Sequence, residues 1–215
     1  MDKNAISLED FANLLVEDAN PNLQLADPTL VQYYSDLKER VYWINDTIGD
    51  NYLDLISKII RWNREDRVLP PGSEARKPIK IFFNSPGGSL DVEESLVSVI
   101  ELSETPIYGF ALGMVASASA MILLACHKRF ALKNAYLVLH KGSCQNISGD
   151  YINVQNAMED YRQQVEKLET FLLQRTAIPQ DIISEKLKSD WYIRGEQLIE
   201  YKLIHEWVTN IKVLL

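Results

Sequence analysis

Two serines, Ser117 and Ser119, lie in the segment Gly113–Ala120, which otherwise contains only small and apolar residues. Hydroxyl groups in such surroundings need hydrogen-bond partners or a chemical purpose. A serine in the first turn of a buried helix is suited to nucleophilic attack, because the helix N-terminus favours negative charge and the next N–H faces a developing oxyanion. Hydroxyls bonded to carbonyls one turn back explain the two serines equally well. Both interpretations stay open.

A second candidate is the turn Ser85-Pro86-Gly87-Gly88. Adjacent glycines leave backbone N–H groups unshielded by any Cβ, and such donors can stabilise an oxyanion. A plain turn between a strand and a helix is the competing interpretation. A phosphate cradle is disfavoured, because neither a P-loop pattern nor GxGxxG is present.

Of the three histidines, only His140 stands at the end of a predicted strand, as a general base would. His127 is predicted to be a solvated turn residue, and His205 a cation near the end of the last helix. A structural role for His140 remains open. No HxxxH or Cys/His cluster has metal-ligand spacing, so we expect no metal and no organic cofactor.

A serine nucleophile needs a base, and the base needs an acid that fixes its tautomer. The chain contains 30 acidic residues, and spacing does not select one of them. The residues alone therefore indicate a serine hydrolase whose third member is unassigned.

The elements that must position these residues alternate between strand and helix, which predicts an α/β fold with helices packed on a sheet. Predicted strands cover 79–83, 106–112 and 135–139. Predicted helices cover 7–20, 51–62, the apolar window 114–126, 151–175, 179–188 and 195–203. The polar stretch 63–78, with Pro70-Pro71-Gly72, is predicted to be a surface loop.

The composition of the chain limits its partners and its location in the cell. The 215 residues carry a net charge of -8, which argues against a nucleic-acid partner. Two cysteines suit a reducing compartment. The start shows no secretory signal, and the window 114–126 is too short to cross a bilayer, which needs about 20 residues. We therefore expect a cytoplasmic protein without membrane contact.

Taken together, several segments resemble the Clp protease proteolytic subunit (ClpP) family. FNSPGGS at 83–89 is similar to its (I/F)NSPGGS motif, and GMVASASA at 113–120 to its nucleophile motif. LVLH at 137–140 is similar to the segment holding the family's histidine, and the stretch from Asp190 to Ile204 follows the DxF…EYGLVD pattern. LKERV at 37–41 looks like the entry to its first strand, and the resemblance covers about 37–211.

The resemblance implies a ClpP/crotonase-like fold and a serine endopeptidase that cleaves unfolded polypeptides. Ser117 would be the nucleophile, His140 the base and Asp190 the orienting acid. The backbone N–H groups of Gly88 and Ala118 would form the oxyanion hole. The family's heptameric rings, stacked into a tetradecamer, and a AAA+ unfoldase partner are implied as well. Residues 1–30 are expected to be a divergent N-terminal segment, and 31–215 the peptidase domain with a strand-helix handle at about 142–175.

Departures from the family pattern bear on assembly. In the family a basic residue precedes the aspartate and helps to join the two rings, and Ser189 takes its place here. Ser119 replaces a glycine, Lys202 replaces another, and Lys141-Gly142 replaces the family's proline-containing sequence after the histidine. The stretch 66–77 looks like an insertion. Two alternatives stay open: a ring subunit with weak or no activity, which the loss of the basic residue favours, and a crotonase-type acyl-CoA enzyme, whose superfamily shares the fold and also uses backbone oxyanion holes.

Overall fold

The structure is a computed structural model that describes residues 27–70, 73–142 and 148–214. The chain forms two compact units, divided between Glu39 and Arg40. Helix α2 (Pro28–Lys38) belongs to the first unit, and all other described elements to the second. The helix predicted at 7–20 lies outside the described residues.

Helix α2 begins where its sequence favours a helix start. The Asp27 carboxylate accepts a hydrogen bond from the Thr29 N–H at 2.8 Å, and Pro28 takes the first helical position. Both are typical of helix N-termini, because the cap satisfies a free N–H and proline lacks one.

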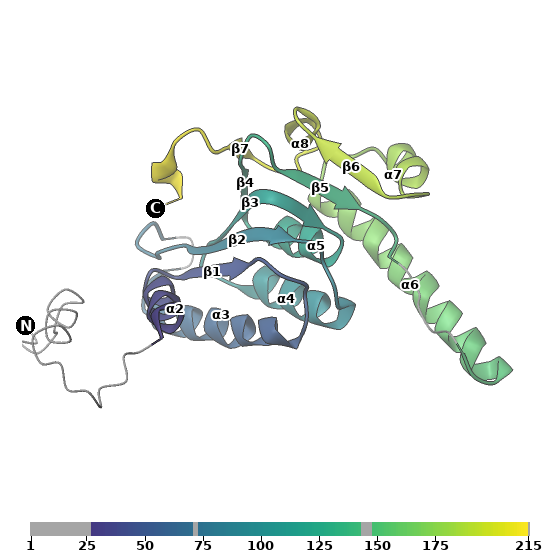
Figure 1. The fold of residues 1–215 in the computed structure, drawn as a ribbon, viewed down its shortest axis with the longest axis horizontal. Helices are drawn as coiled ribbons and strands as arrows, with labels where there is room; N and C mark the ends of the chain where they lie inside the picture. Colours follow the sequence, from purple (N-terminus) through teal and green to yellow (C-terminus); the bar gives the residue numbers. More distant parts are fainter. Residues whose placement is uncertain (1–26, 71–72, 143–147, 215) are drawn as a thin grey trace, which may run out of the picture. The chain divides into compact units, whose positions relative to one another are not determined.

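The second unit is built on one seven-stranded sheet, which confirms the predicted α/β class (Figure 1). The strands are β1 (Val41–Ile44), β2 (Ile79–Ser85), β3 (Ile107–Ala116), β4 (Lys128–Ala131), β5 (Tyr136–Leu139), β6 (Trp191–Arg194) and β7 (Glu206–Trp207). Their order is β1-β2-β3-β4-β7, and all these neighbours are parallel. The long β3 pairs first with β4 and then, near its end, with β5, which pairs antiparallel with β6.

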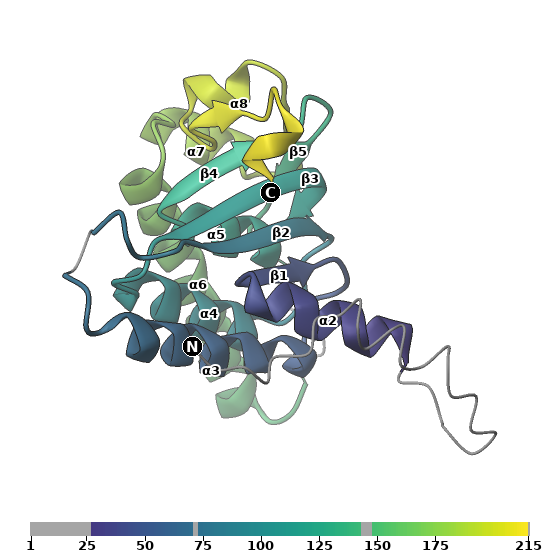
Figure 2. The same cartoon turned by 90° about the vertical axis from the view of Figure 1, so that its left-hand side faces the viewer.

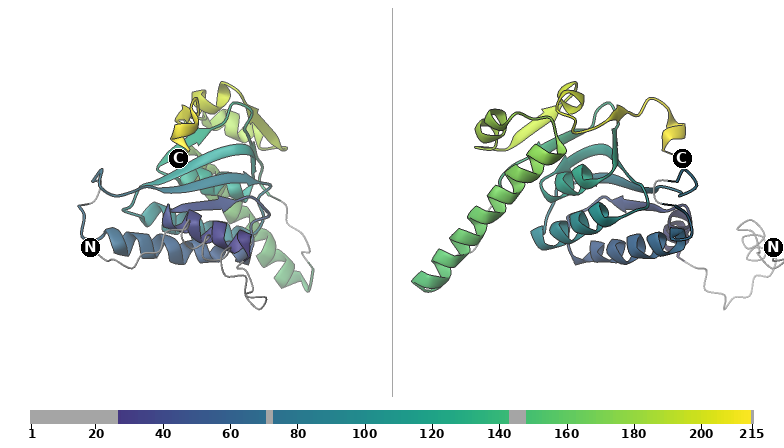
Figure 3. Two further views of the ribbon diagram at one scale, coloured as in Figure 1. Left: turned by 60° about the vertical axis from the view of Figure 1, so that its left-hand side comes forward. Right: turned by 180° about the vertical axis from the view of Figure 1, so that it is seen from behind.

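Helices cover one face of this sheet, as Figure 2 shows for α3, α4 and α5. The helical segments of this unit are η1 (Asp50–Tyr52), α3 (Leu53–Asp66), α4 (Leu90–Leu102), α5 (Ala118–Ala125), α6 (Tyr151–Arg175), α7 (Gln180–Lys186), α8 (Gln197–Glu200) and η2 (Ile211–Val213). The N-terminal part of α6 projects away from the sheet (Figure 3). Within the described ranges, no helix is long and apolar enough to cross a bilayer.

The core explains why the apolar run at 79–83 becomes a strand. Ile79, Ile81 and Phe83 are fully buried, and Phe82 points to the opposite face. There it stacks on Phe110 at 5.0 Å between ring centroids, one member of an aromatic cluster that also contains Phe130. Burial on both faces is typical of parallel strands, whose sequences are continuously apolar.

Two sequence predictions were wrong at their boundaries. The apolar window 114–126 was predicted to be a helix, but Met114–Ala116 complete β3 and α5 begins only at Ala118. Pairing with β5 fixes these three residues as a strand, which local periodicity does not reveal. The helix predicted at 51–62 also continues to Asp66, into the segment predicted to be a loop.

The segment 63–78 is not a plain surface loop, because Asp66 and Arg76 are buried. The Arg40 guanidinium donates to both Asp66 carboxylate oxygens, at 2.7 and 2.9 Å, and the Thr105 hydroxyl donates to one of them at 2.9 Å. The hydrogen bonds from Arg40 lower the pKa of Asp66 although burial opposes the shift. This cluster joins the end of α3 to the starts of β1 and β3.

Glu93 on α4 is a buried carboxyl, and burial raises its pKa to about 8, with a smaller contribution from Glu94. An unfolded chain releases this proton at about pH 4.3, so the folded state binds more protons between these values and its stability falls as pH rises. We expect Glu93→Gln to raise the free energy of unfolding at pH 8 by about 2 kcal/mol, or about 4–8 °C in Tm. Thermal denaturation at pH 5 and pH 8 measures the effect; equal stabilisation at both would contradict a protonated carboxyl.

Candidate active site

The sheet brings Ser117 and His140 to neighbouring strand ends. Ser117 directly follows β3, and His140 directly follows β5. The two strands are parallel, with Ala116 opposite Val138, and the Ser117 N–H donates to the Val138 carbonyl at 2.9 Å. Carboxyl ends of parallel strands meet at one edge of a sheet, where side chains from different segments can act together.

Asp190 reaches the same edge from the other side of β5. Strand β6 runs antiparallel to β5 with Trp191 opposite Leu139, so the preceding Asp190 lies beside His140. Asp190 Oδ1 is 3.5 Å from His140 Nδ1, within ion-pair range but longer than a good hydrogen bond. The His140 side chain is 30% exposed and that of Asp190 61%. The structure thus brings the predicted base and acid into contact.

The backbone of Ser117 has an unusual conformation. Its φ is 55° and its ψ is -130°, where a residue with a Cβ is strained. The residue forms the sharp turn from β3 into α5 and is the N-cap of that helix. The Ala118 N–H, first in the helix, has no intrahelical acceptor because helix geometry leaves the first N–H groups free. Strain at this position is typical of a functional site.

The glycine turn lies directly against Ser117. Gly87 has a φ of 94°, and a Cβ there would lie 2.7 Å from Ser117 Cβ and 3.0 Å from the Ala118 nitrogen. Gly88 has a φ of 154°, and a Cβ there would lie 2.2 Å from the Ile48 carbonyl oxygen. Hydrogen bonds from Ile48 N–H to the Gly87 carbonyl (2.7 Å) and from Ser89 N–H to the Ile48 carbonyl (2.9 Å) fix the turn. Only glycine fits either position.

Ser119 is fully buried and holds the turn to the strand. Its hydroxyl oxygen accepts from the Ala116 N–H at 2.9 Å and lies 2.9 Å from the Ser85 carbonyl oxygen, to which it can donate. We expect Ser119→Ala to keep the serine chemistry but to lower the free energy of unfolding by about 1–3 kcal/mol, because buried backbone groups lose their partner. Chemical denaturation measures the loss, and labelling of Ser117 by a serine-reactive probe serves as the control. Complete inactivation of a folded variant would mean that Ser119 is the nucleophile.

The other two histidines have structural partners. His127 Nδ1 accepts from the Ile107 N–H at 3.1 Å, and His205 Nδ1 accepts from the Arg129 N–H at 2.9 Å. Partial burial, aided by nearby Arg129 and Lys128, lowers the pKa of His205. Its Nδ1 accepts a hydrogen bond and so carries no proton, which argues against the predicted cation at a helix end. Among the described residues, no group of three metal-ligating side chains comes together.

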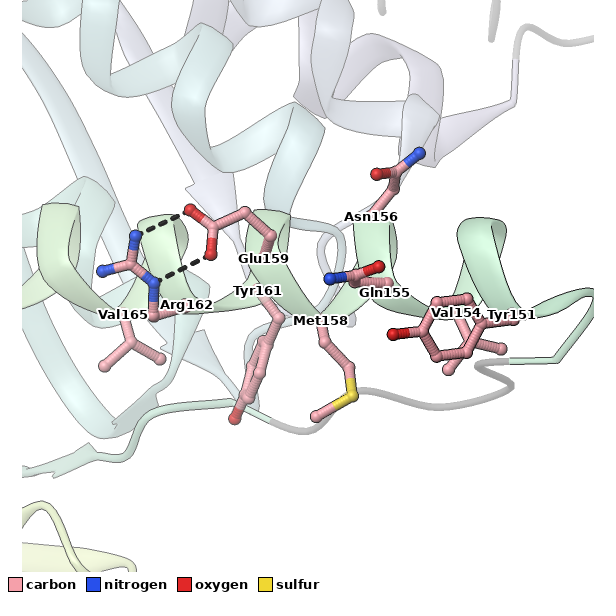
Figure 4. Close-up of a pocket in the computed structure, with 9 residues that line it drawn as sticks. All are labelled: Tyr151, Val154, Gln155, Asn156, Met158, Glu159, Tyr161, Arg162 and Val165. Carbon is pink, nitrogen blue, oxygen red and sulfur yellow. Dashed lines mark hydrogen bonds and ion pairs between the residues drawn. The ribbon is translucent and has the colours of Figure 1, made fainter.

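The predicted handle includes α6, whose bounds match the predicted helix; residues 143–147 of its strand part lie outside the described residues. Figure 4 shows several apolar side chains of α6 on one side of the helix, lining a groove. These are Tyr151, Val154, Met158, Tyr161 and Val165. Tyr151 and Met158 are exposed in the single chain.

Two groups of contacts, one in the body of the sheet and one next to His140, were not found by sequence analysis. Arg129 is buried and donates to backbone carbonyls near the ends of α5, α6 and α8. Lys141, next to His140, forms an ion pair with Glu169 of α6. The partners of Arg129 are backbone carbonyls, and the partner of Lys141 is 28 positions away in the sequence, so no local sequence pattern indicates either contact.

Comparison with known proteins identifies the family to which the chain belongs. The family model described as Clp protease matches residues 31–210. The chain is 29% identical to ATP-dependent Clp protease proteolytic subunit 2 of Treponema pallidum over 130 residues, which are 60% of this chain and 65% of that protein, just under two thirds. It is 26% identical to subunit 2 of Treponema denticola, covering 76% of this chain and 80% of that protein.

A third relative and a solved structure agree. The chain is 27% identical to the ATP-dependent Clp protease proteolytic subunit of Dehalococcoides mccartyi, over 79% of this chain and 82% of that protein. The structure of a point mutant of ClpP1 from Listeria monocytogenes superposes with a TM-score of 0.70 at 21% identity, over 86% of this chain and 99% of that one, which shows a shared fold. With the family model covering most of its length, the chain belongs to the Clp protease family.

Proposed function

We propose that this chain is a serine endopeptidase, the proteolytic subunit of a Clp-type compartmentalised protease. The observation that carries the proposal is the contact between His140 and Asp190 beside the strand end that holds Ser117. Membership of the Clp protease family supports the same reaction class. The chemistry requires no metal or organic cofactor.

In the proposed mechanism, Ser117 Oγ attacks the carbonyl carbon of a peptide bond and its proton passes to His140. Asp190 holds the imidazole ring and stabilises the imidazolium that forms. The N–H groups of Gly88 and Ala118 donate to the oxyanion of the tetrahedral intermediate. Collapse of this intermediate releases the amine, which takes the proton from His140 and leaves an acyl-enzyme on Ser117. Water, deprotonated by His140, then attacks the ester and regenerates the hydroxyl.

Family membership also supports a proposal about assembly: a cytoplasmic homo-oligomeric ring, heptameric, fed with unfolded polypeptides by a AAA+ unfoldase. The exposed apolar side chains of α6, Tyr151 and Met158 among them, are consistent with burial in an assembly. The stacking of two rings is a separate question, because Ser189 replaces the basic residue that helps to join the rings in the family.

A specific observation favours the second candidate, a ring subunit with weak activity and a structural role. Asp190 is mostly exposed and stands 3.5 Å from His140, so in the single chain it orients the imidazole less firmly than a short hydrogen bond would. The acyl-CoA alternative has no support from the family match.

Labelling by a fluorophosphonate probe separates the two candidates, because only an activated serine reacts. We expect labelling at Ser117, located by mass spectrometry of the digested protein, together with a native mass many times that of one chain. Absence of labelling in a correctly assembled protein would favour the structural subunit. Labelling at another serine would overturn the assignment of the nucleophile.

A further inference from the structure

The chain immediately after His140 is held by helix α6. The Lys141 ammonium lies 2.9 Å from Glu169 Oε1. The Tyr161 hydroxyl oxygen lies 3.3 Å from the Lys141 carbonyl oxygen and 3.2 Å from that of Gly142, so its single proton is shared between two acceptors. Figure 4 shows the Tyr161 ring directed from α6 toward this segment. We call Lys141, Tyr161 and Glu169 the α6 clamp.

The clamp lies beyond the point where the sheet holds the backbone. Strand β5 ends at Leu139, whose ladder partner is Trp191, so the sheet no longer pairs Lys141 or Gly142. Gly142 has a φ of 79°, and a Cβ there would meet nothing within 4 Å. Local packing therefore leaves the segment loosely held, and the contacts with α6 supply the restraint.

Helix α6 is itself anchored, so it can act as a fixed support. Arg175 forms an ion pair with Glu101 of α4, and Lys167 lies 3.3 Å from Glu94 of the same helix. Leu172 is fully buried. Tyr161 and Glu169 thus lie on one continuous helix, and the C-terminal part of that helix is fixed to the body of the molecule.

We propose that Lys141, Tyr161 and Glu169 are positioning residues for the peptidase reaction, setting the direction of the His140 imidazole through the backbone that follows it. The proposal rests on the proposed function. His140 has the β5–β6 ladder and Asp190 on one side and the α6 clamp on the other. Release of the clamp lets the base tilt away from Ser117, which slows proton transfer without removing any group that contacts the substrate.

The test uses Tyr161→Phe, Glu169→Gln and Lys141→Met in the full chain, with a fluorogenic peptide as the probe. Each is expected to lower kcat about ten-fold while KM stays within about two-fold, since misplacement of a catalytic group affects the transition state more than substrate binding. The rate of fluorophosphonate labelling should fall with kcat. The charge-reversed pair Lys141→Glu with Glu169→Lys should regain most of the lost kcat.

Matched controls remove similar groups that do not contact this segment. Tyr151→Phe removes a hydroxyl from the same helix, and Glu166→Gln removes an exposed ion pair with Arg162 that lies within α6. Both should keep wild-type kcat. Native mass and circular dichroism verify assembly and folding, and Tyr161→Phe, which removes one oxygen atom, carries the test if another variant fails to fold.

The outcomes separate the two proposals. A wild-type protein that is neither labelled at Ser117 nor active on the peptide overturns the proposed function, and the clamp as a catalytic device with it. An active wild-type protein whose clamp variants keep kcat, or lose it no more than the two controls do, overturns the clamp alone. Failure of the charge-reversed pair to recover activity, with Tyr161→Phe unaffected, also overturns it.

Discussion

Replacement of Ser117 by alanine is expected to abolish peptide cleavage while leaving the fold and the assembly intact. In the proposed mechanism this variant lacks the oxygen that forms the acyl-enzyme, and loss of a triad nucleophile costs on the order of 10⁴-fold or more in kcat. Hydrolysis of a fluorogenic peptide measures the loss, and native mass verifies assembly. Alanine has a Cβ as serine does, so the strain at the φ of 55° is the same in both, and Ser117 makes no side-chain capping hydrogen bond that the substitution would remove.

Ser119→Ala is the matched control for Ser117→Ala, because it also removes one hydroxyl but from a buried, hydrogen-bonded serine two residues away. The control should cleave the peptide and react with the probe. A Ser117→Ala protein that hydrolyses the peptide at the wild-type rate would remove Ser117 from the mechanism.

Arg129→Met is expected to cause the largest loss of stability. Arg129 is buried and donates to five carbonyls: Nε to Leu203 at 3.0 Å, Nη1 to Leu124 and Cys126 at 3.0 and 3.3 Å, and Nη2 to Arg175 and Lys202 at 3.2 and 2.8 Å. These carbonyls lie near the ends of α5, α6 and α8, where helices carry partial negative charge. Removal of the guanidinium leaves several of them without a partner.

We expect the free energy of unfolding to fall by about 3–5 kcal/mol, since each buried polar group left unsatisfied costs about 1–3 kcal/mol and neighbours relax in part. Urea denaturation measures the loss. Arg61→Met is the control, because Arg61 is exposed on α3 and pairs only with Glu65 among its described contacts, so its loss should stay below about 1 kcal/mol. Equal stabilities of the two variants would mean that Arg129 does not hold these segments together.

The elements that could be predicted from the sequence are those whose apolar residues form a local run or recur at a regular spacing. Helix α6 was predicted with its observed bounds because its apolar residues recur at helical spacing, although in the single chain Leu172 is its one buried residue. The strand at 79–83 was confirmed and extends to Ser85. Short strands such as β4 and β7 were missed, since they contain four and two residues and depend on neighbours distant in sequence.

The candidate site was predictable in part for the same reason. A strand end followed by a polar residue identifies His140, because such positions lie at one edge of a parallel sheet. Ser117 was identified instead as a serine in the first turn of a buried helix, and that the preceding strand reaches Ala116 was not predicted. Asp190 could not be selected from 30 acidic residues without the family resemblance, since antiparallel pairing of β6 with β5 brings it to His140. Arg129 and Lys141 were missed because their partners are backbone carbonyls or a side chain on another element.

The connectivity of the sheet fixes when this arrangement can be completed. Strands β3 and β5 pair with each other and both come from the middle of the chain, whereas β6, the other partner of β5, is synthesised only after α6 and α7. A ribosome that has released the chain as far as residue 175 has therefore delivered Ser117 and His140 without Asp190. In the proposed mechanism the triad is incomplete until Asp190 has also been synthesised, so the imidazole of a nascent chain lacks its orienting carboxylate.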